Sequence, residues 1–348
     1  MKRKIMTLLL AVSLGMCGCS GGDNRELTQS GAVSKVADAD TAAAVIDGEE
    51  ISLREWNFYV RMNQMQWEKD YLESYGDDMW SRQVDEDGTT MADSLKEQVL
   101  ETVCRTHLIN QHAGEYEAAL SEEAKGQLRE RAGQFMEAYH EALLEYAGAD
   151  EEFVYEMLCE NELSGLTAEA AVADYTPDIP EEKIHREGIC YVLISTTGIR
   201  DEEGNMTPFT EEEVARRTEA AQELCRKARE SGNLKEAAEA EGMTPIESSM
   251  GASNEGDGQE PLMLDAARLL DVGEISDPIE TEEGWFLVQH TSDYDEEGTE
   301  YWREYLTGLA REEKFAELLE EWEQAARIQL HQEVLELVDV KIVLKELL

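Results

Sequence analysis

The segment Gly273–Val288, which reads GEISDPIETEEGWFLV, constrains the fold more than any other part of this 348-residue chain. After a glycine turn, a short strand ends at Asp277-Pro278, because proline cannot donate a hydrogen bond inside a central strand. Two carboxylates and Gly284 then form a turn, and the apolar residues after it predict a buried strand. The segment therefore predicts a compact strand pair within an α+β domain.

The spacing of this segment resembles the end of parvulin-type peptidyl-prolyl isomerase domains. The resemblance extends over residues 183–291 and implies the order β-α-α-α-β-β. Residue patterns within this range agree with that order. They predict a buried strand at Glu187–Thr196 and helices at Thr210–Ser231, Asn233–Glu241 and Pro261–Asp271. Thr210 and Glu213 are spaced as a capping box.

Parvulins place two histidines, a Cys or Asp, and a Thr or Ser beneath a pocket of Met and Phe. By this resemblance, the positions of the isomerase pocket fall on Tyr191, Met243, Thr244, Met263, Thr281 and Phe286. Tyr191 and Phe286 stand at the two histidine positions, and Met243 or Thr244 stands at the acidic or thiol position. The polar cluster is therefore missing, and we assign no catalytic residue. Tyr191, Met263 and Phe286 either line a cleft for apolar segments or fill the old site as core.

The flanks of this domain have the periodicity of helices. Asp47-Gly48 predicts a turn within a β element at Ala42–Ile51, and Ser52 with Glu55 predicts a capping box that begins the helix Leu53–Tyr75. Further helices are expected at 91–118, 121–147, 151–173 and 301–329, and a closing strand at 333–344.

The opening of this region, AAVIDGEEISLREW, resembles the N-terminal segment of the PrsA and SurA family of extracytoplasmic folding factors. In that family the C-terminal segment packs back on the N-terminal helical lobe. The resemblance thus implies a helical chaperone lobe at 42–180, an inserted parvulin-like domain at 183–291, and a returning helix and strand at 297–348.

The N-terminus has the features of an export signal. Lys2–Lys4 are positively charged, and the apolar run Ile5–Met16 is too short to span a bilayer. Gly18 before Cys19 resembles a lipoprotein cleavage site, which implies a signal peptide at 1–18, a lipid-modified Cys19 and a flexible tether at 19–41. Cleavage before Cys17 and a plain secretory signal are the alternatives.

The charge of the chain excludes some partners. Asp and Glu number 78 against 30 Lys and Arg, which gives a net charge of −48 and disfavours nucleic acid. No cofactor or metal is expected, because Cys104, Cys159, Cys190 and Cys225 lack ligand spacing; their disulfide pairing stays open. The segment Asp293–Glu304 fits a calcium loop only loosely, and a solvated hinge is the preferred interpretation.

Three functions are compatible with these features. The leading hypothesis is a chaperone or foldase, anchored as a lipoprotein to the outer face of a bacterial cell membrane, that binds unfolded exported polypeptides and has a degenerate isomerase site. An active prolyl isomerase acting on secreted proteins and a solute-binding lipoprotein are the alternatives. A homodimer is compatible with the sequence.

Overall fold

A computed structural model of the chain describes residues 39–200, 206–253 and 258–344. The predicted signal peptide, Cys19 and nearly all of the predicted tether lie outside the described residues. The chain is an α+β protein that divides into two compact units. One unit combines the residues up to Tyr175 with those from Glu313 onward, and the other is Thr176–Glu312.

A small sheet brings the two ends of the first unit together. The strands β1 (Ala42–Ile46) and β2 (Glu49–Ser52) form the predicted hairpin, in which Asp47 and Gly48 both have positive φ, 49° and 96°. Positive φ at both central residues is what a type I′ turn needs. The strand β9 (Ile328–Leu330) pairs with the other side of β1, so the sheet order is β2-β1-β9.

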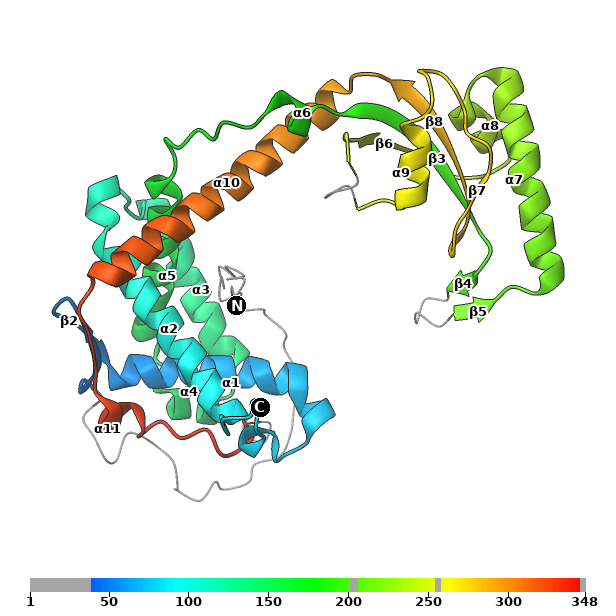
Figure 1. The fold of residues 1–348 in the computed structure, drawn as a ribbon. Coiled ribbons are helices and arrows are strands. Elements are labelled where there is room, and N and C mark those ends of the chain that lie inside the picture. The colour runs from blue at the N-terminus through cyan, green and yellow to red at the C-terminus, as the bar shows by residue number, and fades with distance from the viewer. Residues whose placement is uncertain (1–38, 201–205, 254–257, 345–348) are drawn as a thin grey trace. The chain divides into compact units, whose positions relative to one another are not determined.

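Five α-helices and two short 3-10 helices, η2 (Met79–Ser81) and η3 (Ala113–Tyr116), follow the hairpin. The α-helices are labelled in Figure 1. The α-helices are α1 (Leu53–Tyr75), α2 (Met91–Gln111), α3 (Glu122–Ala138), α4 (Glu141–Ala147) and α5 (Glu151–Ala171). The single helix expected at 121–147 is wrong. Tyr139 adopts an extended backbone, and the side chain of His140 accepts a hydrogen bond that begins α4.

The first half of α1 is buried around much of its circumference, and its apolar residues belong to one core. The helix α10 (Glu296–Ala325) adds Phe315, Leu319 and Trp322 to the same core. The C-terminal residues Val338 and Val340 are also buried there. The residues from Glu313 onward therefore complete the core of the helical unit.

The predicted strand at Glu333–Leu344 is wrong. The short helix α11 (Gln332–Leu335) occupies its start, and none of residues 336–344 forms a strand. Polar side chains on buried α1 take the place of a neighbouring strand: Arg61 donates to the carbonyl of Asp339 at 2.8 Å, and Gln64 donates to that of Ile342 at 2.7 Å. Alternating apolar residues favour a strand only where another strand completes the hydrogen bonds.

The second unit is built on a four-stranded antiparallel sheet with the order β6-β3-β8-β7. These strands are β3 (Glu187–Ser195), β6 (Ile246–Met250), β7 (Ile279–Glu280) and β8 (Gly284–Ser292). The segment after the second helix was expected to hold no strand, so β6 corrects the predicted order. Its IESSM sequence is too polar to read as a buried strand, and pairing with β3 along Glu187–Tyr191 supplies its hydrogen bonds.

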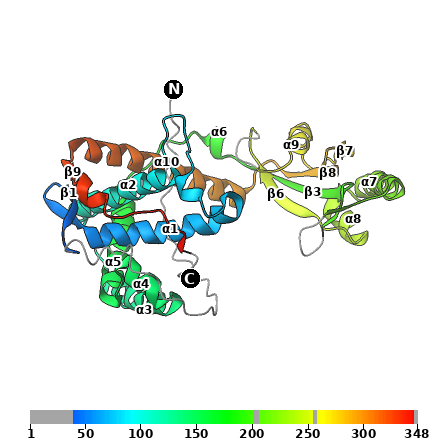
Figure 2. The same cartoon turned by 90° about the horizontal axis from the view of Figure 1, so that it is seen from below.

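Helices cover both faces of this sheet. On one face, α7 (Glu211–Ser231) and α8 (Leu234–Ala240) pack on apolar residues that include Val192, Ile194 and Leu287. On the other face, α9 (Pro261–Ala267) packs on Ile189 and Val288; Figure 2 shows α8 and α9 on opposite sides. The short helix α6 (Glu181–Ile184) precedes β3, and a hairpin, β4 (Gly198–Arg200) with β5 (Met206–Pro208), precedes α7.

Candidate functional site

Three of the expected pocket residues lie on the α9 side of the sheet. Tyr191 and Phe286 come from the neighbouring strands β3 and β8, and their ring centroids are 6.1 Å apart. Met263 comes from α9 and belongs to the same apolar cluster. Met263 is fully buried and Phe286 is 4% exposed, whereas Tyr191 is half-buried. Two of the three side chains are therefore core, and Tyr191 stands at the edge of that core.

The other expected positions do not join this group. Met243 packs against the cluster on the opposite face of the sheet, and Thr244 is exposed. Thr281 lies in the turn between β7 and β8, where its hydroxyl donates to the carbonyl of Gly284 at 3.0 Å and accepts from the N–H of Glu283. Thr281 therefore stabilises the turn.

The sheet leaves apolar surface open beside Tyr191. Cross-strand register places Ile246 opposite Tyr191, and Leu193 opposite Phe286, so all four side chains lie on the α9 face. Ile246 is 44% exposed and Leu193 is 36% exposed. We call these four residues the sheet patch. Its accessible part is formed by Ile246, Leu193 and the half-buried Tyr191, and the patch contains no charged side chain.

The structure describes two histidines in this unit. Neither of them supplies a free polar group to the sheet patch. The ring nitrogens of buried His290 lie 2.9 Å from the carbonyl oxygen of Leu270 and 3.0 Å from that of Ser292. His185 packs against Tyr294 and is partly exposed. Burial raises the pKa of Tyr191, so its hydroxyl stays protonated. That hydroxyl is the one polar side-chain group of the sheet patch.

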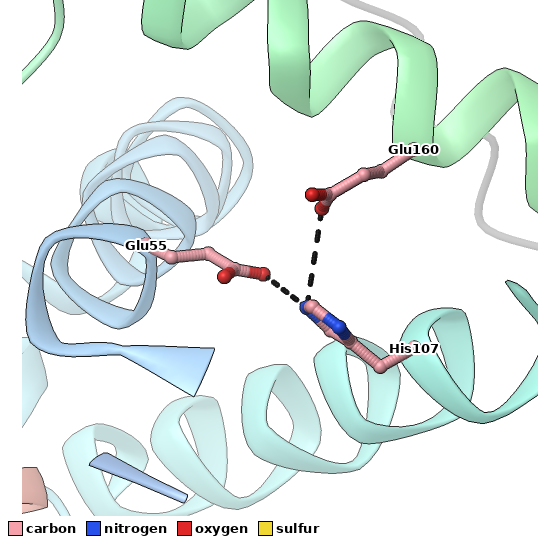
Figure 3. Close-up of side chains that lie close together, drawn as sticks. All are labelled: Glu55, His107 and Glu160. Atoms are coloured by element: carbon pink, nitrogen blue, oxygen red, sulfur yellow. Dashed lines mark hydrogen bonds and ion pairs between the residues drawn. The ribbon is translucent and has the colours of Figure 1, made fainter. Parts of the chain in front are cut away.

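A second candidate site lies inside the helical unit. Glu55 on α1, His107 on α2 and Glu160 on α5 point toward one another (Figure 3). His107 Nε2 is 2.7 Å from Glu55 Oε1 and 3.9 Å from Glu160 Oε2. Glu55 and His107 are each 5% exposed. One imidazole and two carboxylates, which are all possible metal ligands, therefore converge; Glu55 and His107 are buried, and Glu160 is partly exposed.

The electrostatics of this cluster are unusual. Burial by itself would lower the pKa of His107, but the hydrogen bond and charge of Glu55 raise that pKa to about 9. Burial and the charge of Glu55 raise the pKa of Glu160 to about 7. Burial, with the charges of Glu55 and Glu160, also raises the pKa of Tyr59, so this phenol remains neutral. Strongly perturbed groups that face one another are typical of binding sites.

One local sequence signal at this cluster is misleading. Ser52 accepts a hydrogen bond from the N–H of Glu55 at 3.1 Å, as an N-cap should. The Glu55 carboxylate, which was expected to complete a capping box, binds His107. No spacing along the chain relates Glu55, His107 and Glu160, because they come from three helices and only packing brings them together.

The possible calcium segment has another structure. Residues from Glu296 onward are helical, so Glu297 and Glu304 lie on α10. Asp295 precedes this helix and accepts a hydrogen bond from the N–H of Gly298 at 3.1 Å. A helix start thus occupies the place of a calcium loop. Within the described ranges, no helix combines the length and apolar character needed to cross a membrane.

Comparisons with known proteins find similarity in structure alone. No family model and no curated sequence matches the chain. Solved structures that resemble it include PrsA foldases and SurA-like chaperones. The PrsA foldase of Lactococcus lactis is 12% identical, with 84% of this chain and 96% of that chain covered and a TM-score of 0.40. The PrsA foldase of Streptococcus pneumoniae is 17% identical, with coverages of 73% and 96% and a TM-score of 0.36. A SurA-like chaperone of Campylobacter jejuni is 10% identical, with coverages of 83% and 98% and a TM-score of 0.29.

Proposed function

We propose that this protein is an extracytoplasmic chaperone of the foldase type, held at the outer face of a bacterial membrane by lipid on Cys19. Its clients are unfolded exported polypeptides, which it holds by transient burial of their apolar segments. Its parvulin-like unit binds apolar or proline-containing segments and has little or no isomerase activity.

The residues of the sheet patch are the main support for binding with little or no isomerase activity. Catalysis of prolyl isomerisation must lower a barrier of ~18–20 kcal/mol by stabilising a twisted amide. Tyr191 and Phe286 stand where the resemblance expects two histidines, and Met263 and Phe286 are packed as core. The Tyr191 hydroxyl alone offers a polar contact to a twisted amide. Apolar surface that is partly open still suits binding.

Exposed aromatic side chains on the helical unit offer a second holding surface. Tyr71 and Tyr75 near the end of α1 are 43% and 41% exposed, and their ring centroids lie 6.2 Å apart. Trp67 continues this row, 5.8 Å from Tyr71, and stacks on Trp80 at 6.2 Å. We call Trp67, Tyr71 and Tyr75 the aromatic row; Trp80, which is 3% exposed, supports Trp67 from the core. Trp56 and Trp322 of the same unit are buried in the core and offer no such surface.

One pair of assays on the full chain tests the proposal. We expect suppression of aggregation of an unfolded client at near-stoichiometric amounts, with prolyl isomerisation of a test peptide close to the uncatalysed rate. Tyr191→Phe should change neither. Robust isomerisation that Tyr191→Phe abolishes would instead establish an active enzyme with Tyr191 as its hydrogen-bond donor.

A double variant locates the holding surface. Tyr71→Ser with Tyr75→Ser should reduce aggregation suppression by about half or more, because it removes the exposed end of the aromatic row. Leu269→Ser is the matched control, since Leu269 is 86% exposed and lies in the other unit. Equal loss in both variants would mean that holding depends on exposed apolar area in general. The solute-binding alternative receives no support, because it expects two similar lobes and the two units differ in their elements.

A further inference from the structure

We propose that Glu55, His107 and Glu160 bind one divalent transition-metal ion, for which Zn²⁺ is the best fit, inside the helical unit. This site is separate from client holding and from the sheet patch. It would join three helices that are distant in the sequence.

The geometry is close to that of a metal site. The three ligand atoms all lie within 4.8 Å of one another. Zinc bonds to nitrogen and oxygen of ~2.0–2.2 Å place tetrahedral ligands about 3.4 Å apart. The 2.7 Å separation of Glu55 and His107 must therefore widen by under about 1 Å, and the 3.9 Å separation of His107 and Glu160 must shorten by about half as much. Side-chain torsions alone supply movements of that size.

A further carboxylate orients the imidazole. Glu49 Oε1 lies 3.2 Å from His107 Nδ1, on the side of the ring away from the cluster. Gln111 donates to the other oxygen of Glu49 at 2.9 Å and so fixes its position. A metal ion that displaces the proton between His107 Nε2 and Glu55 would leave the Nδ1 proton on Glu49, the arrangement found in carboxylate–histidine–metal sites. The arrangement leaves His107 Nε2 facing Glu55 and Glu160.

Glu55 and Glu160 share one basic partner in the described part of the chain, the ring of His107. Glu160 Oε2 is shielded from solvent and accepts no hydrogen bond. Among the described residues, no Lys or Arg forms an ion pair with Glu49, Glu55 or Glu160, and His107 is their shared partner. The ion-pair partner of Glu160 is the His107 ring at 3.9 Å, which is too long for a hydrogen bond. A divalent cation would balance two carboxylates and complete the bonding of Glu160.

The donor set also selects the class of ion. Ca²⁺ and Mg²⁺ prefer six or more oxygen ligands, and this cluster offers one nitrogen and two carboxylates. Zinc accepts imidazole and carboxylate together and takes water as a fourth ligand. Because α1, α2 and α5 each supply one ligand, binding would stabilise the folded state over the unfolded chain.

Metal binding by the full chain tests this proposal. One Zn²⁺ should bind per chain when Mg²⁺ is present in excess to occupy the acidic surface. Zn²⁺ should also raise the melting temperature of the protein. Co²⁺ should give the visible absorption bands of a four-coordinate site. Glu160→Gln and Glu55→Gln should each weaken binding at least tenfold, and Glu49→Gln about 10- to 100-fold through the imidazole.

Glu123→Gln is the matched control, because Glu123 is exposed near the start of α3 and loses the same charge. Far-ultraviolet circular dichroism confirms that each variant is folded. Because Glu49 and Glu160 are not fully buried, their variants keep the test independent of core damage. The proposal is overturned if the wild type binds Zn²⁺ no better than Glu160→Gln, or if Glu123→Gln loses as much affinity as the variants of Glu49, Glu55 and Glu160.

Discussion

The carboxylate of Glu68 on α1 accepts a hydrogen bond from the backbone N–H of Leu344 at 2.7 Å, although the two residues are 276 positions apart. Glu68 also accepts from the indole N–H of Trp80 at 3.0 Å. Together with Arg61 and Gln64, it forms a buried polar stripe on α1 that holds the C-terminal segment. The stripe forms hydrogen bonds with the C-terminal backbone that a neighbouring strand would otherwise form.

Arg61→Met should lower the free energy of unfolding by about 2–4 kcal/mol, because it leaves buried acceptors unpaired at about 1–3 kcal/mol each. Arg61 donates to Asn57, Gln64 and the carbonyl of Asp339. Urea denaturation measures the effect. Arg131→Met is the control, since Arg131 is exposed, and should change stability by less than about 0.5 kcal/mol. Equal losses in the two variants would show that the stripe has no special role.

Asp150 should give a stability contribution that depends on pH. It caps α5 by accepting from the N–H of Phe153 at 3.0 Å, and this hydrogen bond, with Arg54, lowers the pKa of its carboxyl. A lowered folded-state pKa means that the contribution is present above the unfolded pKa of ~3.9 and is lost as pH falls through the folded pKa.

Asp150→Ala should therefore cost about 1 kcal/mol at pH 7 and less at strongly acidic pH. Asp150→Asn can keep the cap without titrating. In urea titrations across the acidic range, its stability relative to the wild type should improve as pH falls. A wild type and an Asp150→Asn variant with parallel pH profiles would contradict this assignment.

Cys19 should be the mature N-terminus and should be lipid-modified. Mass spectrometry of the N-terminal peptide checks this directly. Cys19→Ala should move the protein from the membrane to the soluble fraction, and Cys17→Ala should leave it at the membrane, because Gly18 precedes Cys19. The reverse result would place the modification at Cys17.

Much of the client holding should survive removal of the sheet unit. Gly188 pairs directly with Ser292 across β3 and β8, so a short glycine link can close the chain after residues 189–291 are deleted. Aggregation suppression per mole should stay at about half the wild-type value or higher, since the aromatic row lies outside the deletion. Loss of suppression in a deletion variant that still melts cooperatively would assign holding to the sheet unit.

The sequence by itself determined the features that depend on neighbouring residues. The Asp47-Gly48 hairpin, the helix Leu53–Tyr75 and the Thr210 capping box are all present in the structure. Each is specified within a few residues by backbone preference, capping or the period of the apolar side chains. The parvulin resemblance also placed Tyr191 and Phe286 in one pocket, and the two rings lie 6.1 Å apart on paired strands.

Only the tertiary structure decided how distant segments share hydrogen bonds and charge. Apolar residues alternate along 333–344 as they do in a strand. The polar stripe on α1, however, makes hydrogen bonds to the backbone of this segment, and no strand in the described part of the chain pairs with it. The polar sequence of β6 becomes a strand because β3 presents an unpaired edge. The local sequence predicts that Glu55 completes a capping box, but its buried carboxylate binds the ring of His107 instead. In each case the energy of a buried polar group depends on what packs around it, and local sequence does not contain that information.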